Sequence, residues 1–135
     1  MILLSCQAAI EMADGSKSGL ALRALLRPSE MVVAPDALQA QATQQLAALV
    51  GSGRLTEARA RQILWCIDGL TERSIPANAY AAEALSLALE RNISAADALD
   101  VLMARDLPAT LFTLSEPAQN LCTELGVNCT QSVQL

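Results

Sequence analysis

The polar side chains best placed to do chemistry follow predicted strands or begin predicted helices. Ser5 comes directly after an apolar N-terminal segment, and Ser115 follows residues 110–113, which have the composition of a strand. Between them, the residues from Ser94 to Asp97 start a helical pattern. In an open parallel sheet the carboxyl ends of the strands share one edge, and ligands bind beyond it. We therefore expect these side chains to meet at one edge of a sheet.

Residue types that are missing or scattered exclude several kinds of catalytic site. The chain has no histidine, which removes Ser-His-Asp and Cys-His catalysis and histidine-ligated zinc. No glycine-rich loop follows a predicted strand, which argues against a P-loop or a dinucleotide-binding fingerprint. The cysteines lack a metal-ligand spacing, and we expect buried, reduced thiols at Cys6, Cys66, Cys122 and Cys129. A Cys122–Cys129 disulfide is the alternative.

The composition predicts one globular domain over residues 1–135. Hydrophobic residues make up 53% of the chain and aromatic residues only 2%, so burial must come from aliphatic side chains and alanine. Fourteen acidic residues outnumber nine scattered basic ones, and this balance argues against tight unaided binding to a phosphate backbone. We expect no signal peptide, no membrane span and a cytoplasmic location.

Strand-like and helix-like segments alternate along the chain, which predicts an α/β domain with a mostly parallel sheet. Five strands are expected, near Ile2, Val32, Ile75, Leu111 and Val127. Helices are expected at residues 6–13, 19–26, 35–51, 56–69, 79–91, 95–105 and 116–125. Ser18 and Asn78 are predicted N-caps, and Pro35 is predicted in the first turn of its helix.

Four segments give the chain a resemblance that covers almost its whole length. They are residues 1–10 (MILLSCQAAI), 34–41 (APDALQAQ), 92–104 (NISAADALDVLMA) and 110–115 (TLFTLS). In this order the chain resembles the PIN-domain family, and within it the short bacterial ribonucleases that are the toxins of toxin–antitoxin pairs. The third segment is the strongest match, because family members read close to Ser-x-x-Asp-Ala-Leu there. The resemblance implies a three-layer α/β/α fold with a central, mostly parallel, five-stranded sheet.

The same resemblance implies a site that has lost most of its acids. Family nucleases hold Mg²⁺ or Mn²⁺ with four carboxylates, and the matching positions of this chain are Ser5, Gln41, Asp97 and Ser115. Asp97 is the one retained acid. Two-metal hydrolysis needs enough negative charge to hold two dications about 4 Å apart, which neutral oxygens do not supply. We therefore expect no metal cofactor and no metal-dependent nuclease activity.

The remaining acids leave alternatives open. Asp97 is either a surviving metal ligand or the first-turn acid of a helix that Ser94 caps. Asp100 and Glu116 could join Asp97 in a rebuilt acidic site, and the chain would then be a divergent Mg²⁺- or Mn²⁺-dependent endoribonuclease that binds RNA. Otherwise it is a degenerate PIN-like protein that acts by binding other proteins, or a scaffold unconnected with toxin–antitoxin pairs.

The predicted partners follow from the aliphatic helices, which carry more apolar residues than a lone domain of this size can readily bury. We expect a two-fold homodimer, and the resemblance adds an antitoxin-like peptide or protein as a partner. The predicted interface lies in residues 37–50 and 58–67 and includes Leu49, Ile63, Leu64 and Trp65. Trp65 is either the anchor of this interface or a core residue.

Overall fold

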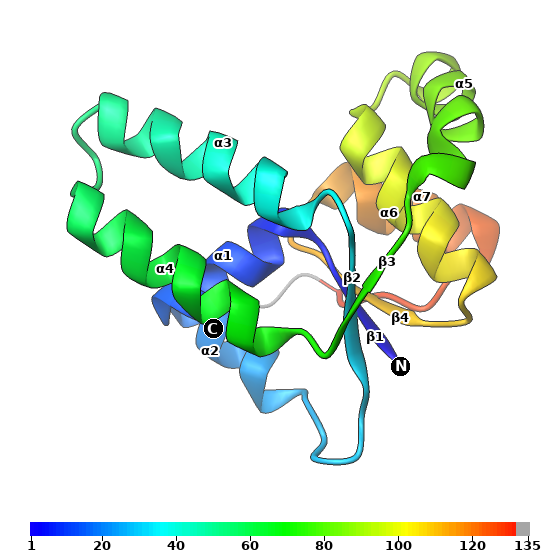
Figure 1. Cartoon of the computed structure of the whole chain (residues 1–135). Helices are drawn as coiled ribbons and strands as arrows, with labels where there is room; N and C mark the ends of the chain where they lie inside the picture. The colour runs from blue at the N-terminus through cyan, green and yellow to red at the C-terminus, as the bar shows by residue number, and fades with distance from the viewer. Residues whose placement is uncertain (132–135) are drawn as a thin grey trace.

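The computed structural model describes residues 1–131 and has four parallel strands with helices between them (Figure 1). The elements, in chain order, are β1 (Ile2–Leu4), α1 (Cys6–Asp14), α2 (Lys17–Ala24), β2 (Val32–Pro35), α3 (Leu38–Gly51), α4 (Glu57–Leu70), β3 (Arg73–Ile75), the 3₁₀ turn η1 (Asn78–Tyr80), α5 (Ala81–Arg91), α6 (Ala95–Asp106), β4 (Thr110–Phe112) and α7 (Glu116–Leu125). The strand order is β3-β2-β1-β4, and every neighbouring pair is parallel. The predicted α/β class and parallel sheet are confirmed.

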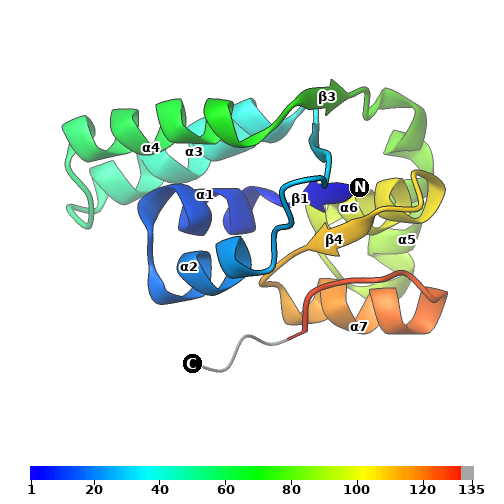
Figure 2. The same cartoon turned by 90° about the horizontal axis from the view of Figure 1, so that it is seen from below.

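Side chains that alternate along the strands divide the core into two layers. Ile2 and Leu4 of β1 pack with residues of α1, α2, α3 and α4, whereas Leu3 packs with residues of α6 and α7. All of β1 and β2 is buried, because helices cover both faces of a parallel sheet. Figure 2 shows α1 to α4 on one side of the strands and α5 to α7 on the other. None of the helices in residues 1–131 has the length and apolar composition needed to span a membrane.

The predicted fifth strand, residues 127–129, is wrong in extent, because this segment makes only one parallel bridge, to Leu111 of β4. The Leu111 amide donates to the Asn128 carbonyl at 2.9 Å, and the Thr130 amide donates to the Leu111 carbonyl at 3.0 Å. The Thr130 hydroxyl then accepts from the Thr113 amide at 3.0 Å and donates to the Thr113 carbonyl at 2.8 Å. A side chain thus replaces the next backbone pairing, and the sheet of the described chain has four strands.

Helix α2 begins earlier than predicted. Ser16, not Ser18, is its N-cap, and the Ser16 hydroxyl accepts from the Gly19 amide at 3.1 Å. This start places Gly19 inside the helix, where an added Cβ would lie 1.8 Å from the carbonyl oxygen of Glu11 on α1. The glycine therefore allows α1 and α2 to approach closely.

The predictions for Pro35 and Asn78 are also wrong. Pro35 ends β2, where it pairs with Ile75 of β3, and the Asp36 amide donates to the Ile75 carbonyl at 2.8 Å. Proline is tolerated at this end of the strand because β1 pairs only with Val32 and Val33, so its missing amide costs no hydrogen bond to β1. Asn78 begins the 3₁₀ turn η1, and α5 starts after that turn with no side-chain cap.

The four cysteines do not share one environment. Cys6 and Cys122 are buried, Cys129 is half-buried, and all four thiols are free. Cys66 is exposed, so its predicted burial is wrong. The reason is that α4 turns a stripe that includes Ile63 and Ile67 toward the core, and Cys66 lies outside that stripe.

Candidate functional site

A cavity of about 300 Å³ lies where β1 and β4 end, and residues of α1, α3 and α6 line it. It brings together the four positions that the family resemblance singles out, Ser5, Gln41, Asp97 and Ser115. Other polar side chains in its lining are Gln7, Gln44, Gln45, Ser94, Asp100 and Thr113. The parallel order of the strands thus places Ser5, Asp97 and Ser115 at one edge of the sheet, as the sequence predicts.

Three helices begin at this cavity, each with a serine as its N-cap. Ser5 precedes α1, Ser94 precedes α6 and Ser115 precedes α7. Each hydroxyl oxygen accepts a hydrogen bond from a backbone amide in the first turn, at distances of 3.1 to 3.4 Å. The serines therefore stabilise the helix starts, a role that requires no ligand.

One hydrogen bond connects α6 and α7 at the cavity. The Ser115 hydroxyl donates to Oδ2 of Asp97 at 2.7 Å. The amide of Asp97 is also the group that the Ser94 hydroxyl caps, at 3.1 Å. Asp97 therefore fits the interpretation as a first-turn acid that complements the positive end of α6. One of its carboxylate oxygens is already held by a protein donor.

Asp100 is the buried acid of the cavity. Its side chain is only 5% exposed and makes no hydrogen bond to another residue in the described chain, and the exposure that remains opens into the cavity. Burial raises the pKa of Asp100 well above its usual range, and the nearby charge of Asp97 adds to this. The buried carboxyl group therefore favours its protonated form when nothing is bound beside it.

Cys6 also lines the cavity but is a poor nucleophile. Burial, and then the charge of Asp100, raises the pKa of Cys6 to about 11. The thiolate is the reactive form of cysteine, and a thiol with this pKa stays protonated at neutral pH. The cavity therefore does not support covalent chemistry at Cys6.

Glu116 does not join the two aspartates. It is exposed and lies outside the lining of the cavity, because Ser115 occupies the cap and the next residue of α7 points elsewhere. Within residues 1–131, no group of three His, Cys, Asp or Glu side chains is arranged to hold a metal ion. The rebuilt acidic site predicted from Asp97, Asp100 and Glu116 thus loses one member.

Sequence reasoning missed the glutamines of α3 other than Gln41. Gln44 and Gln45 follow Gln41 by three and four residues, so all three share one helix face, and all three line the cavity. This spacing was visible in the sequence. The position of that face beside the cavity was not, because it depends on how α3 packs beside α1.

The predicted interface residues divide between the core and the surface. Ile63 is only 2% exposed, so it cannot be an interface contact in this fold, and Leu49 and Leu64 are half-buried. Trp65 is 80% exposed, which excludes its alternative role as a core residue. A shallow hollow beside it on α3 and α4 is lined by Gln39, Arg61, Leu64, Trp65 and Asp68.

Comparisons with known proteins leave both places unassigned. No family model matches this chain, and no curated protein matches it. The basis for a function is therefore the cavity at the sheet edge and the surface around Trp65.

Proposed function

We propose that this protein is a PIN-like domain without metal-dependent nuclease activity that acts through protein–protein binding. The main support for the proposal is that one cavity is lined by all four positions, Ser5, Gln41, Asp97 and Ser115. Resemblance to the family assigns a carboxylate to each of these four positions. Strand order accounts for their meeting at one edge of the sheet, and three of them are uncharged here.

The charge of the cavity is too small for two-metal hydrolysis. Asp97 already accepts a hydrogen bond from Ser115, and burial favours the neutral form of Asp100. Serine hydroxyls and glutamine amides do not offset the repulsion between two dications held about 4 Å apart. The site therefore retains the position of the family's metal centre but lacks its charge.

The hollow beside Trp65 supports the binding part of the proposal. Trp65 is 80% exposed, and tryptophan is enriched among the residues that contribute most to binding at protein interfaces. Arg61 and Asp68, which have opposite charges, line the same hollow. With a two-fold axis placed between Arg61 and Asp68 on α4, Arg61 of one copy would face Asp68 of the other. Arg61 also pairs with Glu57 of its own helix at 3.5 Å. A homodimer through α3 and α4 is the proposed assembly, and an antitoxin-like peptide is the further partner that the resemblance implies.

Two measurements test this function. Sedimentation at micromolar concentration should give a dimer for the intact chain and a monomer for a folded Trp65→Ala variant. Thermal unfolding with added Mn²⁺ or Mg²⁺ should show no site-specific stabilisation. An ion bound at a specific site would raise the unfolding temperature by mass action, and the proposed protein has no such site. A monomer at micromolar concentration overturns the dimer, and stabilisation by Mn²⁺ that Asp97→Asn removes overturns the loss of metal binding.

A divergent endoribonuclease is the second candidate, favoured by one observation. Asp100 lies beside Asp97 in the cavity, which gives a pair of acids in place of one. This candidate predicts Mn²⁺-dependent RNA cleavage that both Asp97→Asn and Asp100→Asn abolish. Glu116→Gln is the matched control and should leave cleavage unchanged, because Glu116 is exposed outside the cavity.

A further inference from the structure

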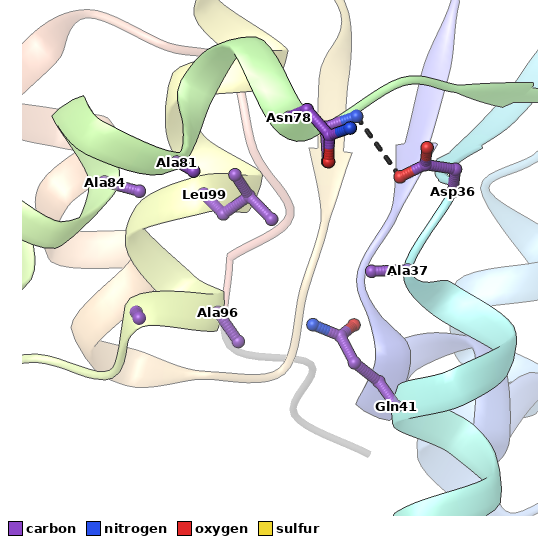
Figure 3. A pocket seen from close by; sticks show the side chains of 10 residues that line it. Asp36, Ala37, Gln41, Asn78, Ala81, Ala84, Ala96 and Leu99 are labelled. Carbon is purple, nitrogen blue, oxygen red and sulfur yellow. Dashed lines mark hydrogen bonds between the residues drawn. The ribbon is translucent and has the colours of Figure 1, made fainter.

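Two hollows adjoin at the carboxyl edge of the sheet. One is the polar cavity of about 300 Å³ described above. The other, of about 330 Å³, lies between the start of α3, η1, α5 and α6. Gln41 and Ala96 line both, so the two hollows meet at these side chains, and we refer to them together as the groove. In Figure 3, the side chain of Gln41 extends from α3 toward Ala96 on α6, at this boundary.

The polar half holds acids without a base. Asp97 and Asp100 line it, and no lysine or arginine of the described chain does. The Asp100 carboxyl group is more than nine-tenths buried, lacks a hydrogen-bond partner in residues 1–131 and faces this space. No side-chain polar atom of residues 1–131 is both fully enclosed and unpartnered, so the Asp100 oxygens are accessible from this space. A cation or donor placed there offsets the cost of burying the carboxylate. The polar half therefore suits a group that is positively charged and donates hydrogen bonds.

The other half is mostly apolar. Its walls are formed by the methyl groups of six alanines and the side chain of Leu99, and the alanines are Ala37, Ala77, Ala81, Ala84, Ala95 and Ala96. The acid at its rim, Asp36, already accepts a hydrogen bond from the Ala77 amide at 3.2 Å. The second oxygen of Asp36 stays exposed at the rim, and Gln41 and Asn78 are the other polar side chains of this half. The alanine-lined part between them suits a chain of methylene groups.

We infer that the groove binds a primary alkylamine, with the ammonium group beside Asp97 and Asp100 and the aliphatic chain along the alanine-lined half. The ammonium donates up to three hydrogen bonds, which Asp100 and the side-chain oxygens of Gln41 and Gln44 can accept. A divalent metal ion would leave the apolar half empty. A neutral alcohol would leave the acids without a counter-charge. This inference goes beyond the proposed function and does not depend on a dimer through α3 and α4.

An alkylammonium group can come from a free aliphatic amine or from a lysine side chain. Titration calorimetry on the full chain at pH 8 should compare butylamine, hexylamine, 1-hexanol and a lysine blocked at both backbone ends. Affinity should rise about fourfold for each added methylene that becomes buried. Hexylamine should bind at least tenfold more tightly than 1-hexanol. Blocked lysine binding as tightly as butylamine assigns the site to a protein segment, and weaker binding assigns it to a free amine.

Two variants separate the halves of the groove. Asp100→Asn should weaken hexylamine binding at least tenfold. Glu72→Gln, which removes an exposed acid between α4 and β3 and outside the groove, should leave hexylamine binding unchanged. Ala96→Leu places a larger side chain where the two halves of the groove meet. It should abolish the increase in affinity from butylamine to hexylamine. Ala82→Leu, an exposed α5 position outside the lining, is its matched control.

Three results would overturn the inference. The first is hexylamine binding no more tightly than 1-hexanol. The second is an equal loss of affinity in Asp100→Asn and Glu72→Gln, which would mean attraction to the net charge alone. The third is an increase in affinity with amine chain length that Ala96→Leu leaves unchanged. Sedimentation of the same samples tests the dimer independently, so failure of the ligand and failure of the proposed function are distinguishable.

Discussion

The cavity at the sheet edge and the surface around Trp65 differ in how firmly the fold holds their side chains. In the cavity, Ser115 caps α7 and binds Asp97 at 2.7 Å, and Asp100 is nearly enclosed. On α4, by contrast, Trp65 is 80% exposed, although its neighbour two positions away, Ile67, is fully buried. Changes around the cavity should therefore alter folding free energy, whereas changes at Trp65 should alter association alone.

The largest expected effect is Gly19→Ala, with Gly69→Ala on α4 as its control. Gly19 packs α2 against α1, the helix that begins at the cavity, and an added Cβ would lie 1.8 Å from a backbone oxygen. The helices must separate, so the free energy of unfolding should fall by about 3 kcal/mol or more. A Cβ at Gly69 meets nothing within 4 Å, so Gly69→Ala should instead raise it by up to about 1 kcal/mol. Urea denaturation measures both changes in the free energy of unfolding. Changes of the same sign would contradict the predicted difference between Gly19 and Gly69.

The next effect concerns Asp100→Leu and its dependence on pH. The pKa of Asp100 is raised in the folded state, whereas the unfolded chain ionises near pH 3.9. As pH rises above about 4, the unfolded state therefore loses its proton first, and the stability of the native chain falls until pH passes the folded pKa. Asp100→Leu lacks this decline, so it should be more stable by about 1–3 kcal/mol at pH 8. Its advantage should shrink toward pH 4.

Urea denaturation from pH 4 to pH 8 provides that measurement. Ala82→Leu, which adds a leucine at an exposed position of α5 and removes no ionisable group, should leave the pH profile of stability unchanged. A profile for Asp100→Leu that runs parallel to that of the native chain would show that Asp100 ionises normally in the folded state.

A smaller effect distinguishes two helix caps. Ser115→Ala removes the cap of α7 and the hydrogen bond to Asp97, and should cost about 1–2 kcal/mol of unfolding free energy. Thr56→Ala removes only the cap of α4 and should cost about 1 kcal/mol. A double-mutant cycle of Ser115→Ala with Asp97→Asn should give a coupling of at least about 0.5 kcal/mol. Additive effects would mean that the bond between α6 and α7 contributes nothing to stability.

The smallest effect on folding is expected for Trp65→Ala. Because the side chain is exposed, the free energy of unfolding of the monomer should stay within about 0.5 kcal/mol of the native value. Measurements at a concentration low enough to dissociate the dimer isolate this quantity. A loss of several kcal/mol there would show that Trp65 packs against its own chain.

Most elements could be predicted because their signals are local. Thr56, Ser94 and Ser115 cap the helices that follow them, and each cap bond spans three residues. The wrong starts depend on distant segments. Gly19 lies inside α2 because α1 approaches it, and Pro35 belongs to β2 because Ile75 pairs with it.

What the sequence determined about the site was which positions meet. Ser5, Asp97 and Ser115 share one edge because the strands before Ser5 and Ser115 are parallel, and strand topology follows from the order of elements. Only the tertiary structure decided which side chains are enclosed. Burial of a side chain depends on neighbours contributed by distant segments, and its position in the sequence does not reveal them. Asp100 is therefore enclosed in the cavity, Glu116 stays in solvent, and Trp65 lies on the surface of a helix that buries Ile67.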